Sequence, residues 1–161
     1  MARYQVHGFN HQRQVNPRAC WFTCMQMMVR YFEDQAHASL ADLSGPEYVP
    51  TMKDRFDRGS NPSWAEWRQW AQQLGFTALN MTPNENGILT TLQKYGPIMY
   101  SGTWGATFDG HVVIITGVDT TGPTVSIDDP LELRAPVSKE MYTYMSTLTQ
   151  SLWENPLFVY A

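Results

Sequence analysis

The sequence predicts an α+β fold in which a helical N-terminal half packs on an antiparallel sheet formed by the C-terminal half. Three observations support this fold class. Residues 20–34 form an uninterrupted helical pattern, 111–118 form a continuous apolar run, and a turn at 119–123 leads into an alternating strand over 124–128. Hydrophobic residues make up 43% of the 161 residues, which is enough for one core, so we expect a single domain over 1–161.

The first half contains the helix that we expect to be most deeply buried. Residues 20–34 favour a helix and contain no Gly or Pro, and their apolar side chains lie nearly all around it. Ser63 followed by Glu66 has the signature of a capping box, and it predicts a helix over 64–74 that ends at Gly75. The remaining expectations for this half are a short helix near 39–43, an irregular connection over 45–62 and a strand over 76–81.

The second half is richer in strand signals. Residues 111–118 are apolar enough for a strand that is covered on both faces. The other expected elements are a helix over 88–95 that begins at Asn84 or Asn86, strands over 98–101 and 157–161, an extension of the sheet over 131–136 and a helix over 138–148.

Composition and charge exclude several classes of protein. The net charge is −4 and no basic run occurs, so neither nucleic acid nor a membrane surface is an expected partner. No segment reaches 18 uninterrupted apolar residues, and the polar N-terminus has no signal-peptide core. We therefore expect synthesis in the cytoplasm without a signal peptide, which is compatible with secretion by a dedicated leaderless system.

Cys20 is the first candidate for chemistry because it opens the buried helix. A thiol at the positive end of a helix is more readily ionised, and the thiolate is the form that attacks carbonyl carbons. Cys24 lies one turn further along, where we expect a buried and inert thiol. The alternative reading is that both are core cysteines, since free cysteine is among the most buried residue types.

His111 begins the apolar strand, and a polar residue at that position needs a partner. If the following turn is centred on Thr120, Asp129 lies opposite His111 in the hairpin and can fix the ring's tautomer. Asp128 competes with Asp129, because a slip of one residue exchanges the faces. A purely structural His–Asp pair is the alternative. Gln14, six residues before Cys20, could donate to a developing oxyanion beside the Cys20 N–H.

These segments together resemble the papain-like cysteine peptidases, and most closely their compact bacterial branch. The block Gln14-Val-Asn-Pro-Arg-Ala-Cys20 matches the family pattern of Gln, five residues and the nucleophilic Cys, and Cys20-Trp21-Phe22-Thr23-Cys24 matches the effector proteases injected into plant cells. Gly110-His111 followed by an apolar strand is similar to the second block. Ile127-Asp128-Asp129-Pro130 is similar to the third, which assigns the triad position to Asp129.

The resemblance implies a papain-like fold, a Cys20–His111–Asp129 triad with Gln14 at the oxyanion, and no cofactor. It implies a protein or peptide substrate, and for a toxin an immunity or inhibitor protein as a further partner. The branch also includes the double-glycine leader peptidases, which usually have Gly after the nucleophile, whereas Trp21 stands there in this chain. An effector-type or toxin-type protease is therefore the nearer match.

Other functions remain open at this point. Papain-like folds also cleave peptidoglycan amides and leader peptides, and the fold does not choose among these substrates. A non-catalytic binding domain on the same fold is a further alternative. The remaining one is a zinc-binding module formed by His7, His11, Cys20 and Cys24, although their order reverses the usual one.

Overall fold

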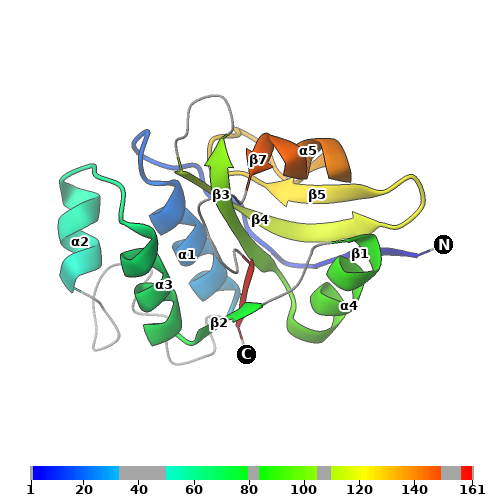
Figure 1. Cartoon of the computed structure of the whole chain (residues 1–161), viewed down its shortest axis with the longest axis horizontal. Helices are drawn as coiled ribbons and strands as arrows, with labels where there is room; N and C mark the ends of the chain where they lie inside the picture. Colours follow the sequence, from blue (N-terminus) through cyan, green and yellow to red (C-terminus); the bar gives the residue numbers. More distant parts are fainter. Residues whose placement is uncertain (1, 33–49, 80–83, 105–109, 150–156, 161) are drawn as a thin grey trace.

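The computed structural model describes residues 2–32, 50–79, 84–104, 110–149 and 157–160 (Figure 1). Within them eight strands form one antiparallel sheet, in the order β2-β8-β3-β4-β5-β6, with β1 paired to β4 and β7 paired to β3. The strands are β1 (Arg3–Gln5), β2 (Phe76–Leu79), β3 (Ile98–Trp104), β4 (Gly110–Asp119), β5 (Thr124–Asp128), β6 (Val137–Glu140), β7 (Leu148–Thr149) and β8 (Leu157–Tyr160). This arrangement confirms the predicted α+β class.

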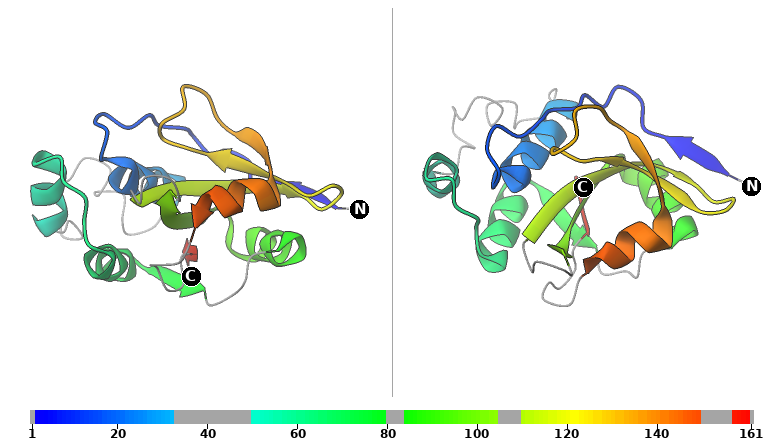
Figure 2. Two further views of the ribbon diagram at one scale, coloured as in Figure 1. Left: turned by 45° about the horizontal axis from the view of Figure 1, so that its top comes forward. Right: turned by 90° about the horizontal axis from the view of Figure 1, so that it is seen from above.

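Five helices accompany the sheet in the described part of the chain. They are α1 (Cys20–Tyr31), α2 (Pro50–Asp57), α3 (Trp64–Gln73), α4 (Glu85–Tyr95) and α5 (Met141–Thr147). Figures 1 and 2 show α1, α2 and α3 gathered on one side of the molecule, with α4 and α5 on the opposite side. No helix in the described ranges has the length and apolar character needed to cross a membrane.

The sheet separates two apolar clusters, which explains why consecutive residues in the middle of β4 are apolar. Val112 and Ile114 of β4 join the cluster formed with α1 and α3, whereas Val113 and Ile115 join the cluster formed with α4. Positions 111–118 of β4 are all buried, as the continuous apolar run predicted. Burial on both faces therefore fixes which side chains of β4 point to α1.

Local signals placed two helices correctly. Ser63 Oγ accepts a hydrogen bond from Glu66 N at 3.2 Å and Glu66 Oε1 accepts one from Ser63 N at 3.1 Å, so the predicted capping box forms at α3. Asn84 caps α4 by accepting from Gly87 N at 2.8 Å. The helix expected near 39–43 lies outside the described residues.

The irregular connection expected over 45–62 is wrong in part, because α2 lies within it. Pro50 suits the first turn of a helix. The rest of the segment is mostly polar, so it lacks the apolar periodicity by which a helix is recognised in a sequence. Tertiary contacts supply what the pattern lacks. Met52 is fully buried, and the ring of Phe56 lies 4.5 Å from that of Phe22 on α1.

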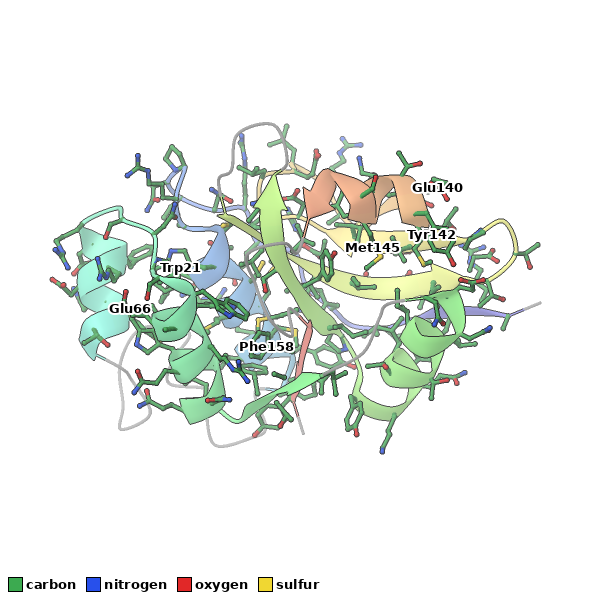
Figure 3. The ribbon with its side chains drawn as sticks, viewed as in Figure 1. Trp21, Glu66, Glu140, Tyr142, Met145 and Phe158 are labelled. Atoms are coloured by element: carbon green, nitrogen blue, oxygen red, sulfur yellow. The ribbon has the colours of Figure 1, made fainter. Side chains whose placement is uncertain are left out.

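The region after β5 was also predicted incorrectly. No strand forms over 131–136, and the helix expected from residue 138 begins only at Met141 because 137–140 pair with β5 as strand β6. Glu140 then accepts hydrogen bonds from the N–H groups of Tyr142 and Thr143, at 3.3 and 2.7 Å, which caps α5 (Figure 3). The pairing of β6 thus overrides the local helix preference. Strand β1 was not predicted.

A β-bulge interrupts the pairing of β4 with β5. Gly117 pairs with Ser126, but Ile115 pairs with Ile127, so Thr116 is the extra residue. The N-terminal strand stabilises the bulge. The Thr116 carbonyl oxygen accepts hydrogen bonds from Val6 N at 2.8 Å and from Gln5 Nε2 at 3.0 Å.

Gly117 is the residue that leaves room for the Gln5 side chain on the bulge. A Cβ at position 117 would overlap Gln5 Oε1 and lie 2.9 Å from Ser126 Oγ. We expect Gly117→Ala to lower the free energy of unfolding by about 1–3 kcal/mol, the usual cost of overpacking, as measured by urea denaturation. In a Gln5→Ala background the same change is expected to cost less. Equal costs in both backgrounds would show that Gln5 is not the obstacle.

Candidate active site

Cys20 is the first residue of α1 and is 5% exposed. No side chain caps α1 at Ala19. The first-turn N–H groups and the positive end of the helix dipole therefore face the N-terminal side of Cys20. Thr23 makes both of its bonds to the Ala19 carbonyl oxygen, from N at 2.9 Å and from Oγ1 at 2.8 Å, which secures the first turn. The thiol is therefore held rigidly at a helix N-terminus.

Cys24, one turn further along α1, is fully buried. Its thiol donates to the Val112 carbonyl oxygen at 3.3 Å. Burial raises the pKa of Cys24 well above its ordinary value, and the nearby charges of Cys20, Asp129 and Asp128 raise it further. Cys24 is accordingly a neutral thiol that attaches α1 to β4.

His111, the second residue of β4, contacts both of its expected partners. His111 Nε2 lies 3.0 Å from Asp129 Oδ1, and the same oxygen accepts from Leu131 N at 2.9 Å. Burial lowers the pKa of His111, but hydrogen bonds to Asp129 and Cys20 outweigh burial and raise it from 6.5 to about 9. Because Nε2 is engaged by Asp129, Nδ1 is the ring nitrogen left for Cys20. A pKa of about 9 favours the protonated form of the ring at neutral pH.

The hairpin register differs from the expected one. Asp119 pairs with Thr124, so the turn is centred beyond Thr120, and the direct opposition of His111 and Asp129 is wrong. Ile114 lies opposite Asp128, and the same register sets Asp129 level with residue 113. His111 and Asp129 are therefore diagonal neighbours on one face, within reach of each other's side chains.

The bulge decides which of the two aspartates shares a face with His111. Without the extra Thr116, the register near the turn would continue with Ile115 opposite Asp128, and Asp128 would lie on the face of His111. One inserted residue exchanges the faces and brings Asp129 there instead. Asp128 pairs with His11, whose Nδ1 lies 2.5 Å from Asp128 Oδ1. No sequence signal announced this bulge or the role of His11.

Gln14 lies in the segment that leads into α1. Its backbone N–H donates to the Pro130 carbonyl oxygen at 2.9 Å, and its side-chain Nε2 donates to the Asn16 carbonyl oxygen at 2.8 Å. Asn16 also accepts from Ala19 N at 3.2 Å, so the Gln14 amide lies beside the turn that precedes Cys20. An amide nitrogen carries two hydrogens, and the bond to Asn16 uses one of them.

A hollow of about 180 Å³ adjoins Cys20 and is rich in indole rings. Trp21 packs against Trp67 and Trp70 between α1 and α3, with ring centroids 6.5 and 5.4 Å away (Figure 3). The residues around the hollow come from α1, the approach to α3 and the start of β4: Cys20, Trp21, Asn61, Pro62, Trp64, Trp67, Gly110 and Val112. The aromatic content hinted at such a surface, but sequence reasoning did not locate it.

The zinc alternative is not supported by the geometry. His11 is engaged by Asp128, and the Cys24 thiol is directed to a backbone carbonyl. His7, His11, Cys20 and Cys24 are all described, and the described residues contain no cluster of three or more metal-ligating side chains.

A cysteine at the start of a buried helix, beside a histidine that is held by a carboxylate, defines a cysteine peptidase of the papain-like fold. The chain belongs to the family described as "Papain-like cysteine protease AvrRpt2", which matches residues 3–148. The fold is similar to the crystal structure of a C39-like peptidase from Bacillus anthracis, with a TM-score of 0.65 and 16% sequence identity over 100% of this chain and 98% of the other. No curated protein matches the sequence.

The two cysteines differ enough in environment to be distinguished chemically. We expect iodoacetamide at pH 6 to label Cys20, which adjoins the hollow, and to leave Cys24 unlabelled until the protein unfolds, as read by mass spectrometry of tryptic peptides. A Cys24→Ala variant, which contains only Cys20, is the control for assignment. Equal labelling rates in the folded protein would contradict an activated Cys20.

The raised pKa of His111 also predicts how stability depends on pH. The protonated ring is favoured by folding, so its contribution is complete below about 6.5 and is lost as the pH rises through about 9. We expect the free energy of unfolding to fall over this window by up to about 3 kcal/mol, since one pKa unit is about 1.4 kcal/mol. Urea denaturation at pH 6 and pH 9 measures this. A His111→Gln variant that shows the same fall would refute the assignment.

Proposed function

We propose that the chain hydrolyses an amide bond in a protein or peptide, with Cys20, His111 and Asp129 as its catalytic triad. The observation that carries this proposal is the bridging position of His111, which bonds to Asp129 Oδ1 at 3.0 Å and to Cys20. Asp129 holds Nε2, and the ring thereby presents its other nitrogen to the sulfur. A non-catalytic domain would have no need of this arrangement.

The chemistry proceeds by acyl transfer. The Cys20 thiolate attacks the carbonyl carbon of the scissile amide, and the oxyanion that forms accepts hydrogen bonds from the Cys20 N–H and the Gln14 side chain. The protonated His111 ring gives its proton to the leaving amine, and the carbon–nitrogen bond breaks to leave a thioester. His111 then takes a proton from water, whose oxygen attacks the thioester and releases the acid. The step uses no cofactor.

The hollow beside Cys20 supports an apolar side chain next to the scissile bond. Trp21, Trp64 and Trp67 give it an aromatic wall, and Val112 adds an aliphatic one. Burying an apolar side chain there contributes about 25 cal/mol for each Å² removed from water. A polypeptide with an apolar residue near the cleaved bond is therefore the substrate class that this wall favours.

The family supports a role as a secreted effector or toxin-type protease. The match extends over residues 3–148, and Trp21 follows the nucleophile where leader peptidases usually have Gly. A toxin of this type requires an inhibitor or immunity protein in the cell that makes it. Cleavage of unfolded protein, with no release from purified peptidoglycan, would support the protease assignment over the amidase.

Kinetics of paired variants test the triad. We expect Cys20→Ala to abolish hydrolysis of a peptide with an apolar residue before the scissile bond, and Asp129→Asn to lower kcat/KM at least about 10-fold more than Asp128→Asn. The reason is that only Asp129 contacts the catalytic ring. Thermal unfolding of each variant is the control for folding. A larger loss in Asp128→Asn would move the third triad position to that residue.

A further inference from the structure

A second histidine–carboxylate pair lies one residue along the chain from the first. His11 Nδ1 is 2.5 Å from Asp128 Oδ1, and His11 Nε2 is 2.7 Å from the carbonyl oxygen of Glu132. The side chains of Asp128 and His11 are only 3% and 16% exposed. The triad mechanism makes no use of this pair, although a buried carboxylate is costly to maintain.

The two bonds of His11 require a definite number of protons. The Glu132 carbonyl oxygen only accepts, so Nε2 carries a hydrogen. The bond between Nδ1 and Asp128 then needs one further proton, whether it resides on the ring or on the carboxyl group. Removing that proton leaves a carboxylate facing a bare ring nitrogen, and the bond is lost.

The surroundings of the pair contain few other charges. Burial raises the pKa of Asp128, the hydrogen bond and charge of His11 lower it, and the charge of Asp129 raises it. The Cys24 thiol, which also senses Asp128, stays neutral because burial raises its pKa. Arg13 and Arg134, the nearest cations in the two segments, are exposed.

The pair joins the two segments that carry the supporting groups of the active site. Gln14 follows His11 by three residues, and its N–H donates to the Pro130 carbonyl oxygen at 2.9 Å. Asp129 follows Asp128 directly, and its carbonyl oxygen accepts from Glu132 N at 2.9 Å. His11, through Asp128 and Glu132, therefore holds both ends of the turn that contains Asp129.

We propose that His11 is a positioning residue: in its singly protonated pair with Asp128, it fixes the segment that carries Gln14 against the segment that carries Asp129. This inference rests on the proposed roles of Gln14 and Asp129 in hydrolysis. The bond between His11 Nδ1 and Asp128 Oδ1 is the contact that keeps the two segments together.

The first test compares His11→Gln with His7→Gln, a matched change at an exposed histidine of the same segment. His11→Gln is expected to lower kcat about 10- to 100-fold with little change in KM, because displacement of catalytic groups by about 1 Å has costs of that order. The rate of Cys20 alkylation by iodoacetamide is expected to fall less than kcat, since alkylation depends on the Cys20–His111 pair but forms no oxyanion. A kcat equal to that of His7→Gln would overturn the proposal.

The second test uses Asp128→Asn, which keeps the shape of the site and remains informative if His11→Gln fails to fold. An amide can donate to Nδ1, so a neutral ring makes both bonds and no proton is needed. We expect this variant to retain most of the wild-type kcat at pH 7, because the bond between residue 128 and His11 persists. A loss of kcat as large as that in His11→Gln would overturn the role of this bond.

A measurement without substrate separates this inference from the proposed function. The ring nitrogen chemical shifts of His11 at pH 7 are expected to show a hydrogen on Nε2, in the wild type and in Asp128→Asn, because the Glu132 carbonyl oxygen only accepts. This result with an inactive wild type would reject the triad but retain the His11 bridge. A His11 ring without a hydrogen on Nε2 would reject the bridge itself.

Discussion

The position of β4 is the constraint on which the rest of the structure depends. This strand pairs with β3, β5 and β1, and it packs against α1 on one face and α4 on the other. It carries His111, and the Val112 carbonyl oxygen binds the thiol of Cys24. A slip of one residue would exchange the buried faces and separate His111 from its partners. Double-sided burial makes such a slip costly and so keeps the ring in place.

The bulge at Thr116 determines which of the two aspartates after β5 contacts His111. Two adjacent aspartates end the β5 segment, and pleating directs them to opposite sides. Because of the extra residue in β4, Asp129 lies on the same face as His111 and contacts it. Asp128 lies on the other face and contacts His11. Gln5 of β1 donates a hydrogen bond to the Thr116 carbonyl oxygen. Strand β1 therefore helps to hold the bulge that sets Asp129, rather than Asp128, on the face of His111.

Two neighbouring buried carboxyl groups would be unfavourable without hydrogen-bonding partners, since desolvation and mutual repulsion both act against their charged forms. Each is met by one histidine, and the two histidines come from segments 100 residues apart in the sequence. The N-terminal segment, β4 and the end of β5 thereby converge on one polar cluster beside α1. The indole rings of Trp21, Trp64 and Trp67 border the neighbouring hollow.

The sequence by itself determined the elements whose signals are local. Periodicity, caps and turns placed the helix at Cys20, the capping box at Ser63 and the apolar strand after His111. The papain-like class was indicated by the resemblance of three sequence blocks to that family. Only the tertiary structure decided what depends on distant contacts. Helix α2 and strand β6 form because they pack or pair with partners that their own sequences do not reveal. The choice of Asp129 over Asp128 depends on one unpaired residue in another strand, because a bulge reverses side-chain direction and leaves no mark on local propensity.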